Sequence, residues 1–570
     1  MSINLAIGLV ISFPIAQTRC DYRYLQRVEA PLFTKIFLSS LISVFSFSTA
    51  LAVIGNPNAP VGGTVYFDLG GEPATLNPYT STDGYSQIIH AYVFDTMTTR
   101  NPDTYEVEPN LAEKFEISKD GLSFTFYLRK DAKFHDGKPI STEDVKFSYE
   151  SIMNPDYKAI VLRPFYTFIT DVIVHDSHKI TFKVKEKYFK NIDFIGGMPI
   201  LEKSKYGNPK KSMNKKLYGS GPYILDQWQK GRKIILKRND KWWGFKLDSN
   251  KGLYNYKKIV YRFVRENNVK VEMLKKGTLD FLAMRPIAFE KLAVGEAWGK
   301  KVFKVKAENK AARGYGFVGW NLNSPKLNDS KVREALSLLL DRNFIVDKFL
   351  YNLYEPITGP WNQHSMYADS SVKADSFDPQ KALKLFREAG WKDSDKNGVL
   401  DKMINGKKVD MSLTIITAAD ETLKILTTYK EEAKKVGVDI DLKLVEWQTL
   451  KKLRSERKYE GMALAWGGIV HLDPHQIFHS DNAVAGGSNF VDYKNKEVDK
   501  LIDKARGIMS NKERAPLLKK VFKQIAMDRP YLFMFTPKYS LYGHTKRMKK
   551  VKDSLTYSVG SEYWWVEKEK

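Results

Sequence analysis

The fold class is decided by residues 411–447, MSLTIITAADETLKILTTYKEEAKKVGVDIDLKLVEW. The stretch begins with an apolar run, MSLTIIT, whose length and β-branched residues are typical of a buried strand. It continues with TLKILTTYKEEAKKVG, which has the spacing of an amphipathic helix, and ends on DIDLKLVEW, which alternates like a second strand. Strand, helix and strand in this order predict a β-α-β unit and therefore an α/β fold.

The segments on either side extend this mixture of helices and strands. Upstream, KFEISKDGLSFTFYLRKDAKFHDG alternates around Asp120-Gly121, which predicts a hairpin. Downstream, a single helix is predicted over 331–350 because a capping residue, Asp329, precedes residues with helical spacing. Another helix is predicted to open at Pro379, a residue that suits the first helical turn.

Length and charge limit the class of protein. The chain has 570 residues, which is too long for one core and predicts two or three domains. Its formal net charge is +25, but lysines and acidic residues are mixed throughout and no nucleic-acid-binding motif is present. We therefore expect a basic, solvated surface and no nucleic-acid partner. The single cysteine, Cys20, lies in a segment expected to be removed, so no disulfide is expected.

The N-terminal residues have the pattern of a secretion signal, but the pattern begins at Lys35 and not at the start of the chain. Lys35 precedes the apolar run IFLSSLISVFSF (36–47), and Ala50-Leu51-Ala52 fits a small-x-small cleavage site. The apolar run is too short for a comfortable membrane span. Residues 1–34 are interpreted as an extension ahead of the signal. We expect residues 1–52 to be cleaved and the mature chain to be periplasmic.

Six further motifs occur in a fixed order. They are EPATLNPY (72–79), NLAEKFEISKDGLSFTFYLRKDAKFHDGKPISTEDVKFSYESI (110–152), GSGPY (219–223), RNDKWWG (238–244), KVREALSLLLDR (331–342) and FDPQKALKLFREAGW (377–391). Together they resemble the bacterial solute-binding proteins of the peptide/nickel class (family 5), the extracytoplasmic receptors of ABC importers. The second motif follows the family signature closely. NPNAPVGGTV (56–65) and the segment 242–266 resemble the oligopeptide and microcin C-type branch.

The resemblance implies an α/β fold of the two-lobed periplasmic binding protein type (type II, class C), with an extra domain inserted in the first lobe. The implied divisions are an N-terminal extension and signal peptide (1–52), the first part of lobe I (53–95), the inserted subdomain (96–218), the second part of lobe I (219–316), lobe II (317–535) and a C-terminal return to lobe I (536–570). Closure of the lobes is expected to bury the ligand.

The resemblance also implies ligand-binding residues. Trp447, Arg454 and Trp466 fall where oligopeptide-binding members place two pocket tryptophans and a carboxylate-binding arginine. The residue types suit that task, because indole faces give broad apolar contact and a guanidinium can clamp a carboxylate. The alternative is that both tryptophans are core residues that end strands.

Two positions depart from the oligopeptide-binding members. Ile469 stands where those members place an aspartate that holds the amino terminus of the peptide, and Ala463 stands in place of a second arginine. Asp473, in HLDPHQ, could provide the missing carboxylate, or it could begin a helix ahead of Pro474. Whether the ligand has a free amine therefore stays open.

Two segments could hold metal ions. Residues 393–401, DSDKNGVLD, match the first nine positions of a calcium loop, with oxygen ligands expected from Asp393, Asp395, Asn397 and Asp401. Ile404 replaces the glutamate of the twelfth position, so the alternatives are a weak structural calcium site and a plain Asx-turn loop.

His475 and His479 could share a helix face and bind a transition metal, but the spacing shows no third ligand. The alternative is a pair of ordinary surface or cleft histidines.

The sequence favours a receptor that binds oligopeptides or peptide-like solutes and delivers them to an ABC permease with its ATPase subunits. The same scaffold could instead bind a metal chelate, a sugar or a conjugate. A secreted enzyme is the third hypothesis, although GxSxG, HExxH and P-loop motifs are absent from the sequence. We expect a monomer that requires no cofactor.

Overall fold

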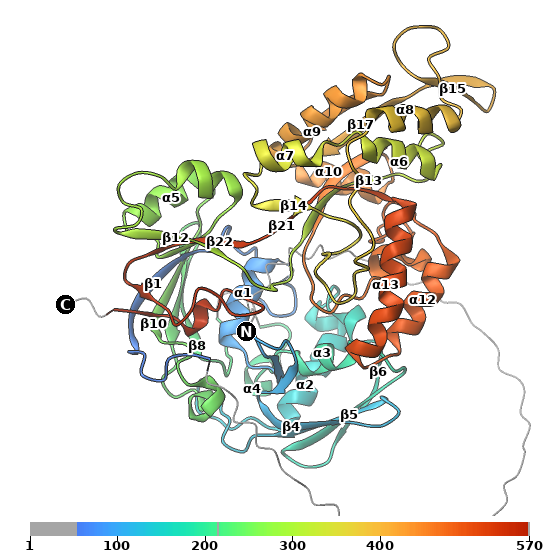
Figure 1. Cartoon of the computed structure of the whole chain (residues 1–570). Coiled ribbons are helices and arrows are strands. Elements are labelled where there is room, and N and C mark those ends of the chain that lie inside the picture. Colours follow the sequence, from blue (N-terminus) through green and yellow to red (C-terminus); the bar gives the residue numbers. More distant parts are fainter. Residues whose placement is uncertain (1–53, 82, 212, 214–215, 568–570) are drawn as a thin grey trace, which may run out of the picture.

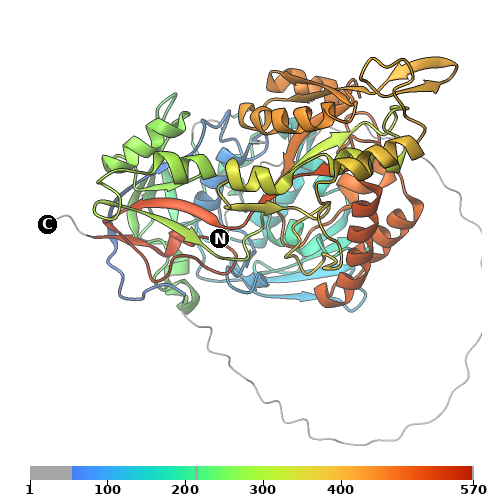
Figure 2. The same cartoon turned by 45° about the horizontal axis from the view of Figure 1, so that its top comes forward.

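A computed structural model of the chain describes residues 54–81, 83–211, 213 and 216–567. It contains two α/β lobes, each built around its own large sheet and its own hydrophobic core (Figures 1 and 2). The predicted signal segment, residues 1–52 with Cys20, lies outside the described residues. None of the described helices is both long and apolar enough to cross a membrane.

The first lobe is built on a seven-stranded mixed sheet. Its central strand, β1 (Gly62–Asp68), pairs in parallel with β10 (Tyr256–Arg262) and β11 (Phe281–Ala283). The antiparallel outer strands are β9 (Lys233–Arg238), β8 (Tyr223–Gln229), β22 (Ser540–Thr545) and β12 (Val302–Ala307). Helices α1 (Gly84–Val93) and α5 (Asn267–Lys275) contact this sheet.

A smaller domain is inserted between α1 and β8. Its four-stranded antiparallel sheet has the order β4 (Ala112–Ile117), β5 (Ser123–Leu128), β7 (Lys179–Val184) and β6 (Ile169–Val174), and β4 and β5 lie at the bottom of Figure 1. The remaining elements are β2 (Thr98–Arg100), β3 (Val107–Pro109), α2 (Thr142–Met153), α3 (Asn191–Gly196) and α4 (Lys203–Tyr206). The hairpin predicted at Asp120-Gly121 is confirmed: the turn joins β4 to β5, and Gly121 has the positive φ of 73° that this turn requires.

The second lobe is built on a five-stranded sheet. Its strands, in order, are β18 (Asp439–Leu444), β17 (Ser412–Thr417), β19 (Gly461–Trp466), β13 (Tyr315–Trp320) and β20 (Tyr531–Phe533). Its helices are α6 (Ser330–Leu338), α7 (Arg342–Lys348), α8 (Pro379–Glu388), α9 (Asp420–Lys434), α10 (Trp447–Ser455), α11 (His475–Phe478), α12 (Lys496–Arg506) and α13 (Asn511–Asp528). The hairpin of β15 (Asp401–Ile404) and β16 (Lys407–Asp410) projects from this lobe (Figures 1 and 2).

The β-α-β unit predicted for residues 411–447 is present as β17, α9 and β18, and the two strands are parallel. The prediction that Trp447 ends the second strand is wrong, because β18 stops at Leu444 and Trp447 is the first residue of α10. The neighbouring strand β17 ends at Thr417, whose carbonyl accepts the N–H of Val445. Residues beyond Val445 therefore have no strand to pair with.

The single helix predicted over 331–350 is also wrong, because the segment forms two helices, α6 and α7. Asp341 begins α7 by accepting the backbone N–H of Phe344. Arg342 is buried at the break, where its guanidinium donates to the carbonyls of Ser337 and Phe533. The helical spacing of apolar residues continues past Asp341, so the sequence pattern does not reveal that a second helix begins there.

The chain passes between the two large sheets by two segments. One is residues 308–314, between β12 and β13, and the other lies between β21 (Phe535–Pro537) and β22. The predicted division at 316/317 falls inside β13, and the division at 535/536 falls inside β21. The hydroxyl of Thr536 donates to the carbonyl of Gly314 at 2.9 Å, so the two crossing segments are tied to each other.

Asp280 links three neighbouring strands of the first lobe and should be critical for its stability. Its buried carboxylate accepts the N–H of Tyr66, the hydroxyl of Thr545 and the guanidinium of Arg547. We predict that Asp280→Ala lowers the free energy of unfolding by about 3–5 kcal/mol, because it leaves a cation without its buried partner. Urea denaturation measures the change. Asp240→Ala is the control: that carboxylate pairs on the exposed surface, and its loss should change stability by less than about 0.5 kcal/mol.

Candidate ligand-binding cleft

A cavity of about 810 Å³ lies where the two crossing segments meet the second lobe. Its wall comes from the crossing residues 308–313 and 538–539, from the loop after β14 (Tyr354–Pro356), and from the loop after β19. The lining is completed by Tyr557 in the C-terminal return of the chain, by Gln476 and Ile477 of α11, and by Ser488. A volume of this size falls in the range of small-ligand sites.

Aromatic side chains with free polar atoms form part of the wall. Trp361 is buried, and its indole N–H has no hydrogen-bond partner in the described structure. The hydroxyl of Tyr315, the first residue of β13, is likewise buried and has no partner among the described residues. Buried polar atoms without partners cost free energy, so both favour a ligand that offers them hydrogen bonds.

Charged groups of both signs line the same cavity. Glu355 of β14 pairs with His364 at 2.7 Å, and Glu308 is a second carboxylate of the lining. Arg313 donates to the side chain and the backbone carbonyl of Asn309, and burial lowers the pKa of its guanidinium. The lining can therefore meet both an amine and a carboxylate on a ligand.

His471 forms a contact between the lobes beside the cavity. Its ring packs against Tyr105 from the inserted domain, with centroids 5.2 Å apart, and it hydrogen-bonds Tyr367. Burial, helped by the charge of Arg100, lowers the pKa of His471 to about 3. The imidazole is therefore neutral at physiological pH and acts as an aromatic contact.

Of the predicted ligand-binding residues, Trp466 lies in the cavity wall, and Trp447, Arg454 and Asp473 lie outside it. Ile469, which departs from the oligopeptide-binding members, also lines the cavity. Trp466 fits both interpretations of its role, because it lines the cavity and also stacks on Phe317 of the core at 5.9 Å. Trp447 is 39% exposed at the start of α10. The ligand-binding roles of Trp447, Arg454 and Trp466 stay predictions.

Arg454 is buried on α10, outside the cavity lining. Its guanidinium lies 5.8 Å from the ring centre of Phe490, and no acidic side chain of the described residues pairs with it. Burial lowers the pKa of this guanidinium, which shows that the surroundings do not favour the charge. A buried cation without a counter-ion is costly, and a ligand carboxylate would remove that cost.

Asp473 holds the two lobes together, so it is not available as a free carboxylate for a ligand amine. It accepts the hydroxyl of Tyr188 from the inserted domain at 2.6 Å and the guanidinium of Arg506 from α12 at 3.1 Å. We call these three residues the interlobe contact. Burial and the Asp473 carboxylate raise the pKa of Tyr188, so its hydroxyl keeps the proton that it donates.

Neighbouring groups strengthen the interlobe contact. The N–H of Phe189 donates to the carbonyl of Arg506 at 3.1 Å, and the guanidinium of Arg514 lies 3.6 Å from the centre of the Phe189 ring. At a different point between the lobes, Arg285 pairs with Glu421 at 2.9 Å. Sequence reasoning missed Tyr188 and Arg506, because residues separated by hundreds of positions leave no local signal.

The calcium-like loop lies far from the cavity, next to the projecting hairpin. Asp393, Asp395 and Asp401 offer carboxylate oxygens within 4.8 Å of one another. The loop also provides its own partners, since Lys408 pairs with Asp395 and Ser394 donates to Asp401. A bound calcium ion would have to displace Lys408, and calcium binding stays a prediction.

Comparisons with known proteins agree with this architecture. The family model of bacterial extracellular solute-binding proteins, family 5 Middle, matches residues 106–489. The oligopeptide-binding protein AppA of Bacillus subtilis (strain 168) is 29% identical over 563 residues, which cover 94% of this chain and 97% of that protein.

Solved structures show the same two-lobed fold. AppA from Bacillus subtilis in complex with a nonapeptide has a TM-score of 0.73 and 27% identity, covering 90% of this chain and all of that chain. NikZ from Campylobacter jejuni in complex with Ni(L-His) has a TM-score of 0.71 and 24% identity, with coverages of 88% and 99%. These likenesses confirm the fold implied by the sequence motifs.

We predict that Tyr188→Phe loosens the closed arrangement of the lobes. The substitution removes a hydrogen bond to a charged group, which contributes about 1.5–3 kcal/mol. Hydrogen exchange of the Phe189 amide should become faster, and small-angle scattering should show a larger radius of gyration. The control is Tyr149→Phe, because that hydroxyl reaches a carbonyl within the inserted domain. Equal exchange in both variants would show that the Tyr188 hydroxyl does not hold the lobes.

Proposed function

The chain belongs to the bacterial extracellular solute-binding proteins of family 5, and from this premise we propose that it captures oligopeptides or peptide-like solutes for an ABC importer. In this role the ligand enters between open lobes, and closure brings the interlobe contact together. The mature chain then delivers its ligand to a membrane permease. We further propose that it works in the periplasm after cleavage of residues 1–52.

The observation that carries the proposal is the composition of the cavity wall. Indole and phenol groups, unpartnered polar atoms and charges of both signs line one space of about 810 Å³. A peptide offers backbone donors and acceptors, two charged ends and varied side chains. Such a wall can hydrogen-bond the backbone, pair with the charged ends and contact the side chains. The peptide-binding relatives support the same ligand class.

A ligand without a free amine is the second candidate. Ile469 lines the cavity at the position where oligopeptide-binding members have an aspartate, and Asp473 is engaged by Tyr188 and Arg506. The carboxylates left in the lining are Glu308 and Glu355. A metal chelate, a sugar or a conjugate remains compatible with this lining.

We predict that the purified mature chain retains a peptide or a peptide-like compound. Native mass spectrometry should show a mass above that of the chain alone, and fragmentation of the released compound should give amino-acid losses. Adding this compound back to unfolded and refolded protein should reduce the radius of gyration. A tightly bound compound without amino-acid fragments would favour the second candidate. Unaltered scattering on binding would contradict the closure mechanism.

Arg454 provides a sharper test once the ligand is known. We predict that Arg454→Met weakens ligand binding by about 2–4 kcal/mol, because a buried ligand carboxylate loses its counter-charge. The same substitution should leave stability unchanged or raise it, because it removes a buried cation without a partner. Calorimetry and urea denaturation measure the two effects. Lys452→Met, on an exposed position of the same helix, is the control and should change neither.

A further inference from the structure

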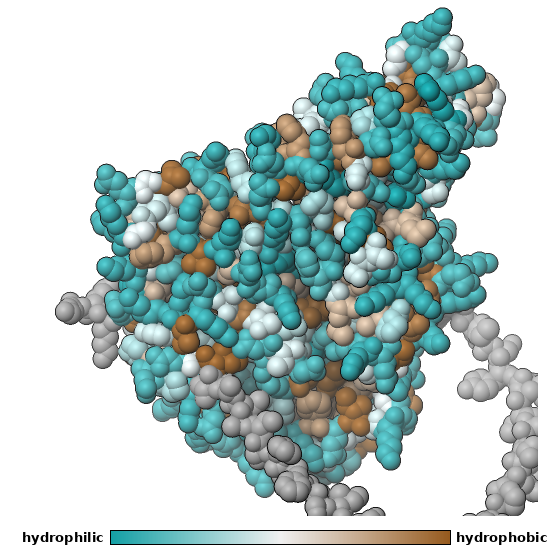
Figure 3. Space-filling view, viewed as in Figure 1, coloured by the Kyte–Doolittle hydropathy of each residue, from teal (hydrophilic) through white to brown (hydrophobic). Residues whose placement is uncertain are grey.

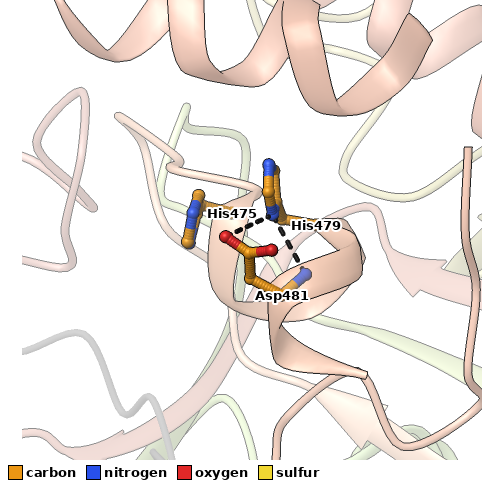
Figure 4. A group of neighbouring side chains, drawn as sticks. All are labelled: His475, His479 and Asp481. Atoms are coloured by element: carbon orange, nitrogen blue, oxygen red, sulfur yellow. Dashed lines mark hydrogen bonds and ion pairs between the residues drawn. The ribbon is translucent and has the colours of Figure 1, made fainter. Parts of the chain in front are cut away.

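Two histidines and an aspartate meet at the end of α11, outside the cavity wall. His475, His479 and Asp481 each place one ligand atom within 4.8 Å of the others. Figure 4 shows the Asp481 carboxylate next to both imidazole rings. Sequence spacing identified the two histidines but no third ligand, because Asp481 reaches them through the turn that follows α11.

The atoms are spaced as ligands around a small ion would be. The Nδ1 atom of His479 lies 3.6 Å from Oδ2 of Asp481. A transition metal about 2.0–2.2 Å from each atom would fit between them. The rings of His475 and His479 stack at 4.3 Å and are nearly parallel, so one ring must turn out of the stack before both rings can direct a nitrogen at one ion.

The second ring nitrogen of His479, Nε2, gives independent support for metal binding by this histidine. His479 is 7% exposed, and its Nε2 atom is buried without a hydrogen-bond partner. Nε2 faces two carboxylates of α12, at 3.5 Å from Asp503 and 3.9 Å from Asp499. Histidines that bind metals through one nitrogen commonly donate the other N–H to a carboxylate. The surroundings of His479 match this arrangement.

We propose that His475, His479 and Asp481 bind a divalent transition-metal ion such as Zn²⁺, with Asp499 and Asp503 orienting His479. Two imidazoles and one carboxylate form a ligand set that Zn²⁺ uses in proteins, whereas Ca²⁺ prefers oxygen ligands alone. Three carboxylates around His479 add attraction for a cation. The nearest guanidinium is that of Arg506, whose charge is compensated by Asp473.

Besides the rotation of a ring, binding requires a shift of the turn after α11. In the described structure, Nδ1 of His479 accepts the backbone N–H of Asp481 at 3.2 Å. The metal takes over the same lone pair, so the turn over residues 480–482 must shift when the ion enters. Asp481 is exposed, and its side chain can follow this shift without disturbing the core.

Zn²⁺ titration of the chelator-treated mature protein tests the site by calorimetry. The wild type should bind one equivalent, and His475→Ala, His479→Ala and Asp481→Asn should each weaken binding about tenfold or more. Asp481→Asn alters an exposed position, so its effect does not depend on changes in folding. Melting temperatures of the metal-free variants check the buried positions.

Three control variants locate the ion. His178→Ala changes a histidine in an exposed turn, His364→Ala changes a histidine of the cavity, and Asp395→Asn changes the calcium-like loop. All three should bind Zn²⁺ as the wild type does. The proposal is overturned if the wild type binds no Zn²⁺, if the cluster variants keep full affinity, or if a control variant loses it. Because this test uses only the metal, it is independent of the receptor function.

Discussion

The structure depends on one constraint: within the described residues, the chain passes between its two large sheets only through two short segments that are bonded to each other. Thr536 bonds Gly314, and Ser540 bonds Asn309, so both crossings lie side by side. Each lobe must therefore form its own core, and the space beside the crossings cannot be filled by either core. The cavity occupies this space.

Hydrophilic residues dominate the visible face of the molecule, and the hydrophobic ones are interspersed among them (Figure 3).

The interlobe contact lies outside the two crossing segments, so it can stabilise the closed arrangement of the lobes. The bond between Tyr188 and Asp473 joins the inserted domain to the loop ahead of α11, whereas the bond between Thr536 and Gly314 joins the crossings. If the lobes close on a ligand as proposed, the free energy of the bond between Tyr188 and Asp473 favours the closed lobes without any contact to the ligand. Such a contact can tune apparent affinity, because a ligand that binds a less populated closed state binds more weakly overall.

Local chemistry made much of the fold predictable. Periodicity identified β17, α9 and β18, the Asp120-Gly121 turn identified a hairpin, and the family motifs implied two lobes. Errors arose where tertiary contacts decided the outcome. Trp447 begins a helix because the adjacent strand has ended, and Arg342 occupies a break that helical spacing conceals. The candidate site was harder, because the role of Asp473 depends on Tyr188, 285 positions away.

Two buried donor groups without hydrogen-bond partners among the described residues lie in the wall of the cleft. They are the Tyr315 hydroxyl and the Trp361 indole N–H, whereas the guanidinium of Arg454 lies outside the lining. Each unmet group costs about 1–3 kcal/mol and more when charged, a cost that an apolar ligand cannot relieve. A ligand that pairs with both wall groups gains this energy on binding, whereas one that lacks a single partner leaves that group unmet. Sites of this kind discriminate strongly against ligands that lack a required polar group. The wall therefore favours ligands with hydrogen-bond acceptors, because a ligand without them leaves the Tyr315 hydroxyl and the Trp361 indole N–H without partners.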